Sequence, residues 1–115
     1  MSERHARSAA VAIGAGVRVL HGTDFPPLGA SAGTTLAVRE LELLVDAGLT
    51  SLGALRAVTL NPAPLLQLEP LSGRIGPGAP ADVVAVPTNP LVSVSALRDL
   101  RAILCQGELV QAGPH

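Results

Sequence analysis

The sequence predicts an α/β protein with a mainly helical first half and a β-rich tail. Three observations predict it. A short apolar run over residues 17–20 stops at Gly22, apolar residues recur at helical spacing over residues 36–60, and turn residues with short apolar runs follow from about Leu68. A buried strand followed by helices is typical of α/β folds, and the later runs predict strands that pair among themselves.

The run over residues 17–20 is expected to form a buried parallel strand, because most of its residues are β-branched or bulky and apolar. Gly22 permits a turn, and the two prolines that follow cannot continue a strand, since they lack ladder donors. Asp24 therefore lies where a strand ends and a loop begins. In α/β barrels that end carries the chemistry, so the loop over 25–33 is either a substrate loop or a plain surface loop.

Caps and apolar spacing predict the helices in the first half of the chain. Thr34 or Thr35 is expected to cap the second helix, Thr50 or Ser51 the third, and Asn61, followed by a first-turn proline, the fourth. The four helices are expected over residues 8–13, 36–47, 52–60 and 62–67.

The tail is expected to contain a strand over residues 82–87, a short helix or turn over 93–100, and a hairpin. The hairpin strands are predicted at 101–105 and 108–111, on either side of the turn residues Gln106 and Gly107. Cys105 is expected to be buried and inert in this apolar hairpin.

The composition excludes several classes of function. The net charge of -1 gives no electrostatic basis for binding nucleic acid or an anionic membrane. All eight basic residues are arginines, which excludes a lysine nucleophile, a Schiff base and a carboxylated bridging lysine. One cysteine excludes an internal disulfide, and no signal peptide is visible, so the cytoplasm is the expected location.

An ordered set of motifs, from about Ala10 to the end, resembles the C-terminal part of metal-dependent amidohydrolases, most closely their imidazolonepropionase-like and dipeptidase-like branch. The set comprises Ala-Gly-Val-Arg at 15–18, Gly-Thr-Asp at 22–24, Glu-Leu at 40–41, Ala-Gly-Leu-Thr at 47–50, Ala-Leu-Arg-Ala-Val-Thr-Leu-Asn-Pro-Ala at 54–63, Gly-Arg-Ile-Gly-Pro-Gly-Ala-Pro-Ala-Asp-Val-Val at 73–84 and Asn-Pro-Leu at 89–91. Gly-Thr-Asp alone is common, but the ordered set at this spacing is specific.

The resemblance implies a fold and a division of the chain. Residues 1–68 would be the last strand of a (β/α)₈ barrel with its preceding and trailing helices. Residues 69–115 would be part of the small β-sandwich domain that flanks the barrel. A chain of 115 residues cannot be a complete barrel, which takes about 250. The chain would therefore be a partial barrel that needs a missing N-terminal portion.

The resemblance and the residues themselves suggest roles for particular side chains. By the resemblance, Asp24 would bind the catalytic metal, expected to be zinc, and carry a proton from the attacking water to the leaving group. The alternative is that Asp24 caps the turn that follows it. Thr23 would orient Asp24 through its hydroxyl, or it is simply a strand residue. His21 could support Asp24 from behind the metal ligands, or it could simply be a packed histidine. Strand alternation argues against its sharing a site with Asp24, because residues at odd separation point to opposite faces. Asp82 would be structural, holding turns together.

The family's other metal ligands are missing from this sequence. The resemblance implies a His-X-His pair and further histidines, whereas the three histidines here, His5, His21 and His115, form no such pair. A catalytic zinc normally has three protein ligands, so one carboxylate cannot hold it. The isolated chain is therefore expected to bind no metal or other cofactor.

Two functions follow from these observations. In the first, the chain is part of an enzyme that hydrolyses an amide or cyclic-amide C–N bond of a small molecule, inactive until the missing portion is supplied in cis or in trans. In the second, it is a non-catalytic remnant or a self-associating module without a metal site, because a lone barrel strand leaves unpaired edges and an uncovered apolar face.

Overall fold

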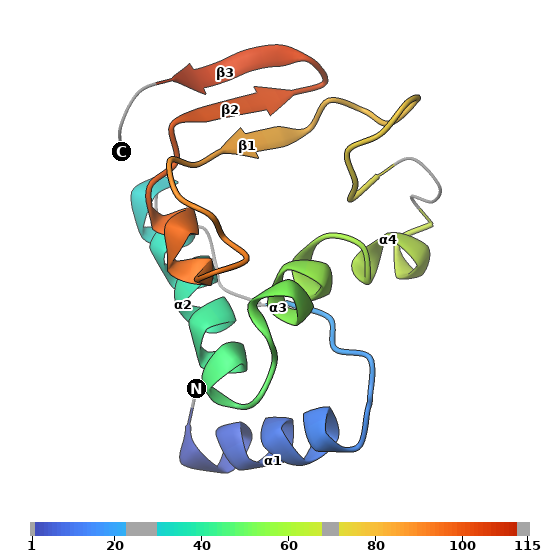
Figure 1. The fold of residues 1–115 in the computed structure, drawn as a ribbon, viewed down its shortest axis with the longest axis vertical. Coiled ribbons are helices and arrows are strands. Elements are labelled where there is room, and N and C mark those ends of the chain that lie inside the picture. The colour runs from blue at the N-terminus through green and yellow to red at the C-terminus, as the bar shows by residue number, and fades with distance from the viewer. Residues whose placement is uncertain (1, 23–29, 68–71, 113–115) are drawn as a thin grey trace.

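The computed structural model of the protein describes residues 2–22, 30–67 and 72–112. Figure 1 shows helices along most of the molecule, an antiparallel sheet at one end and helix α1 at the other. The described elements, in chain order, are α1 (Glu3–Gly14), α2 (Ala30–Asp46), α3 (Ser51–Val58), α4 (Pro62–Leu65), β1 (Val83–Ala85), the 3₁₀ helix η1 (Val94–Arg98), β2 (Ala102–Cys105) and β3 (Glu108–Ala112). Among these helices, none has the combination of length and apolar character that a bilayer span requires.

The predicted helices form, and local caps explain where two of them begin. Helix α1 begins at Glu3, earlier than expected, because the Ser2 side chain caps it by accepting a hydrogen bond from the His5 amide at 3.3 Å. Helix α3 is capped by Thr50, whose hydroxyl oxygen accepts from the Gly53 amide at 2.9 Å. Of the two predicted caps for this helix, Thr50 is therefore the one that acts.

Helix α2 begins at Ala30, so the prediction of a loop through residue 33 and of a cap at Thr34 or Thr35 was wrong. Alanine has the highest helix propensity, and one glycine inside a helix costs only about 1 kcal/mol. The alanines of this stretch therefore outweigh Gly33. The remainder of the predicted loop, residues 25–29, lies outside the described residues.

The core lies where α2, α3 and η1 meet. Leu41 and Leu44 of α2 pack with Ala54 of α3 and Val94 of η1 in one buried cluster. The small side chain of Ala54, which is 0% exposed, lets α3 approach α2 closely. Burial of apolar surface at this junction joins the helical first half to the segment between β1 and β2.

The sheet is an antiparallel meander in the order β1-β2-β3, as the tail of the sequence predicts. The β2–β3 turn places Gln106 and Gly107 at φ of 51° and 81°, the left-handed pair that a two-residue hairpin turn needs. The Asp82 carboxylate accepts a hydrogen bond from the Gln106 amide at 2.8 Å, which confirms its structural role.

Two sequence predictions about individual segments fail. Residues 17–22 form no strand, and Val17 and Leu20 are 57% and 37% exposed rather than buried. The reason is that a strand needs a neighbour, and the described sheet is formed by β1, β2 and β3 alone. Cys105, at the end of β2, is exposed rather than buried. The division at residue 68 stays a prediction.

A charged cluster fastens η1 to α2. The Arg98 guanidinium donates to both carboxylate oxygens of Glu42, with Nη2–Oε1 at 2.5 Å and Nε–Oε2 at 3.2 Å. The Ser95 hydroxyl donates to the same carboxylate, Oγ–Oε2 at 2.5 Å. These hydrogen bonds lower the pKa of Glu42 to about 2, first through Arg98 and then through Ser95.

We expect Glu42→Gln to lower the free energy of unfolding at pH 7 by about 1 kcal/mol, the upper range for a partly exposed pair. A carboxylate with a depressed pKa stabilises the fold above its ordinary pKa of 4.5, and this stabilisation is lost as the pH falls toward 2. The variant should therefore lose less stability than the wild type between pH 6 and pH 3 in urea titrations. Glu3→Gln is the control, because Glu3 is 91% exposed. Parallel pH dependences for wild type and Glu42→Gln would contradict this assignment.

Candidate functional site

The segment over residues 17–22, which leads toward Asp24, is held in place although it forms no strand. The Val17 amide donates to the Ala12 carbonyl at 3.1 Å, which ties the start of the segment to α1. The His21 amide donates to the Ala57 carbonyl at 2.8 Å, which ties its end to α3. The backbone that precedes the predicted catalytic carboxylate is therefore positioned by two helices.

Asn61 supplies a third attachment, and here the sequence prediction needs correction. Asn61 occupies the position before α4, but its side chain makes no capping hydrogen bond. Its amide nitrogen Nδ2 instead donates to the Val19 carbonyl at 2.8 Å, across 42 residues of sequence. This partly buried bond satisfies a backbone oxygen that a neighbouring strand would otherwise satisfy.

Asn61→Ala is expected to cost about 1–2 kcal/mol of unfolding free energy, because it leaves the Val19 carbonyl without its partner. Asn61→Asp should cost at least as much, since the new carboxylate would face the carbonyl oxygen. Asn89→Ala is the control, because the Asn89 side chain accepts a local hydrogen bond from the Leu91 amide in an exposed turn. Urea unfolding measures all three, and a loss for Asn61→Ala no larger than for Asn89→Ala would argue against the attachment.

His21 has an unusual environment. Its ring nitrogen Nε2 is buried and has no hydrogen-bond partner among the described residues. Burial lowers the pKa of His21 below its ordinary 6.5, and the negative charge of Glu40 on α2 opposes this in part. The imidazole is therefore neutral at pH 7. Sequence reasoning named His21 as a candidate but gave no signal for its contact with α3 or for the charge of Glu40.

The other predicted site residues, Thr23 and Asp24, lie outside the described residues, and so does His115. Within residues 2–22, 30–67 and 72–112, no three His, Cys, Asp or Glu side chains gather in a way that could hold a metal ion. His5 lies exposed on α1. The described part of the chain therefore does not fit a metal centre of its own.

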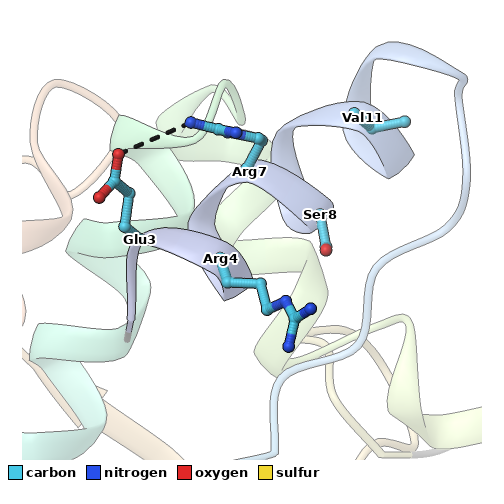
Figure 2. A pocket seen from close by; sticks show the side chains of 5 residues that line it. All are labelled: Glu3, Arg4, Arg7, Ser8 and Val11. Atoms are coloured by element: carbon cyan, nitrogen blue, oxygen red, sulfur yellow. Dashed lines mark ion pairs between the residues drawn. The ribbon is translucent and has the colours of Figure 1, made fainter.

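Two surface depressions are lined by described residues, and neither brings catalytic groups together among them. Figure 2 shows the larger one, of about 700 Å³, on α1, with the exposed pair Glu3 and Arg7 at 3.6 Å on its rim. Its described lining residues, Glu3, Arg4, Arg7, Ser8 and Val11, all come from α1. A second, of about 300 Å³, lies between α2 and η1 beside Glu42 and Ser95, which already bond to each other. Neither has a geometry suited to binding and converting a substrate.

Known proteins resemble this chain over nearly all of its length. The model of the amidohydrolase family matches residues 1–110. Ochratoxinase from Aspergillus niger is 33% identical over 105 residues, which are 90% of this chain and 21% of that protein. The chain thus spans about a fifth of the length of the curated relatives it matches first.

Solved structures give the same result. A Xaa-Pro dipeptidase with bound methionine superposes with a TM-score of 0.82 and 28% identity, covering 93% of this chain and 25% of that one. The crystal structure of A. niger ochratoxinase superposes with a TM-score of 0.76 and 32% identity, covering 94% of this chain and 25% of that one. The described fold thus corresponds to one part of these barrel-type proteins. Together with the match over residues 1–110, these likenesses show that the chain belongs to the amidohydrolase family.

Proposed function

We propose that this chain forms the C-terminal part of a metal-dependent amidohydrolase that hydrolyses an amide or cyclic-amide C–N bond of a small molecule. The observation that carries the proposal is the family match over residues 1–110, which includes the Gly-Thr-Asp motif at 22–24. The relatives support the kind of bond, since they include an ochratoxinase and a Xaa-Pro dipeptidase.

In the proposed reaction Asp24 moves the proton. Its carboxylate accepts a proton from the water that attacks the amide carbonyl and then delivers it to the nitrogen of the leaving group. Amide hydrolysis needs this transfer, because an unprotonated amide nitrogen leaves poorly, and a positioned acid–base residue gives roughly 10²–10⁴-fold. Thr23 is proposed to orient Asp24 through its hydroxyl. The attachments of Val19 and His21 support this role, since they fix the backbone just before the motif.

Amidohydrolases are generally metal-dependent, and we propose zinc as the ion, with Asp24 as one of its ligands. Bound zinc makes hydroxide available near neutral pH. The described residues of this chain offer no group of three ligands. The other ligands would therefore come from the remaining part of a complete amidohydrolase, which this chain does not span. The isolated chain is accordingly proposed to bind no stoichiometric metal and to be inactive.

The proposed partner is the rest of an amidohydrolase, present in the same polypeptide or in a second one. Large apolar side chains remain exposed in the described part of the chain, among them Val17, Leu20, Leu109 and Val110. Such residues are what one expects where further strands and helices pack. The same exposure favours the second candidate, a self-associating module without catalysis. We propose no nucleic-acid or membrane partner, and the cytoplasm as the location.

A chimera tests the proposal. The segment of A. niger ochratoxinase that this chain matches would be replaced by residues 1–110 of this chain, and amide hydrolysis and metal content would be measured. We expect the folded chimera to bind metal and hydrolyse an amide substrate, whereas the isolated chain does neither. A folded, metal-loaded chimera without activity would refute the catalytic role. Stoichiometric zinc in the isolated chain would refute the proposal that this chain alone lacks a complete metal site. Analytical ultracentrifugation of the isolated chain tests the second candidate, self-association.

A further inference from the structure

His21 lies where the segment 17–22 meets α2 and α3, and its ring and backbone are held differently. The backbone amide has a partner, the Ala57 carbonyl at 2.8 Å, whereas the ring nitrogen Nε2 is buried with none among the described residues. Two bonds thus hold the end of this segment to the α3 region, the second being that of Asn61 to Val19. Because the ring nitrogen has no partner among the described residues while the backbone amide has one, the protonation state of the ring can affect how firmly the segment is held against α3.

A neutral imidazole carries one N–H donor and one acceptor nitrogen, whereas the protonated ring carries a donor on both nitrogens. Protonation of His21 would therefore place an N–H at the buried Nε2, where no described group accepts it. A buried donor without a partner costs free energy, and the added positive charge raises the cost. The ring can regain these interactions only by moving into water, which pulls on the backbone of the segment.

We propose that His21 is a pH-sensitive latch whose protonation releases residues 17–22 from α3. The latch would act on the stretch that runs directly into Thr23 and Asp24. It goes beyond the proposed function, because it concerns the docking of this segment in the chain itself. It therefore holds or fails independently of any hydrolytic activity.

Burial of the ring sets the direction of the pH dependence, and one neighbouring charge opposes it. Besides Glu40 on α2, the elements that meet at His21 carry Arg56 on α3 and Arg18 on the segment itself. The negative charge of Glu40 raises the pKa of His21, but burial outweighs it and leaves this pKa below the ordinary 6.5. The docked segment therefore binds a proton less readily than the released one. Docking is favoured above pH 6.5 and weakens as the pH falls below it.

Nuclear magnetic resonance of the wild-type chain provides the first test. Ring resonances of His21 and of exposed His5 are titrated, and amide hydrogen exchange is followed at His21 and Ala54, whose amide lies within the core-facing helix α3. We expect His21 to titrate below free histidine. The protection factor of the His21 amide, relative to Ala54, should fall about tenfold for each unit by which its pKa lies below that of free histidine.

Two variants complete the test. His21→Gln removes the titrating group, so the relative protection of the residue 21 amide should become independent of pH, while His5→Gln should leave the wild-type pH dependence unchanged. Relative protection that is equal at pH 5 and pH 7.5 in the wild type, or a pH dependence that persists in His21→Gln, would overturn the latch. If His21→Gln does not fold, the wild-type titration still decides, because a His21 ring that titrates like free histidine would overturn the latch equally.

Discussion

Asp24→Asn in the ochratoxinase chimera is expected to lower kcat/KM roughly 10²–10⁴-fold, the range that a positioned acid–base residue supplies. Asparagine has nearly the same shape as aspartate, so the fold should tolerate the change. Its amide, however, cannot take up a proton from water and return it to a leaving nitrogen. Steady-state rates on an amide substrate, together with the metal content of each variant, measure the effect and show whether metal binding falls as well.

Asp82→Asn is the matched control for this experiment. Asp82 undergoes the same chemical change, but its carboxylate accepts from the Gln106 amide in the hairpin turn. We expect this variant to lose stability, because its side chain then holds the turn more weakly, and to keep its kcat/KM at temperatures where it is folded. A chimera with Asp24→Asn that remains as active as the parent would rule out the proposed proton transfer.

Features with a local cause could be predicted from the sequence. Thr50 caps α3 through an amide three residues away, and Gln106 and Gly107 form the hairpin turn from their own backbone preferences. The start of α2 was missed because the residues before the expected caps also favour a helix, which therefore begins at Ala30. Local chemistry thus predicted which elements form, and missed one boundary where two local signals competed.

Features that depend on distant residues could not be predicted. The run over residues 17–20 has the composition of a strand, but a strand exists only beside another, and the described sheet does not include it. The side chain of Asn61 reaches Val19 instead of capping its own helix, and no pattern of spacing reveals a bond across 42 residues. The exposure of Cys105 could not be predicted either. Its apolar neighbours in the sequence suggested burial, but its exposure depends on where β2 lies in the folded chain.

The candidate site divides in the same way. Asp24 and Thr23 came from the family's motif, and their roles stay predictions, since they lie outside the described residues. The burial of His21 and the influence of Glu40 on its pKa became visible only in the folded chain. Sequence thus named the residue types that carry the chemistry, whereas the attachments that position them depend on helices far along the chain.

Gly73→Ala is expected to be the most destabilising of the substitutions considered outside the site. Gly73 has a φ of +81°, and an added Cβ would lie 2.8 Å from the carbonyl carbon of Thr59, closer than real Cβ atoms come. The obstacle is backbone at the end of α3, which cannot rotate away as a side chain would. The variant thus combines the cost of a left-handed alanine, about 1–2 kcal/mol, with displacement of α3 or of the segment around Gly73.

Gly78→Ala separates these two contributions. Gly78 has the same φ of +81° but nothing within 4 Å of an added Cβ, so this variant should pay only the conformational cost. Urea unfolding of both variants gives the difference, which we expect to exceed 1 kcal/mol, near the lower end of the usual penalty for overpacking. Equal losses would mean that Gly73 is needed only for its backbone angle. A larger loss for Gly73→Ala would show that the backbone at Gly73 lies against the end of α3 too closely to admit a side chain.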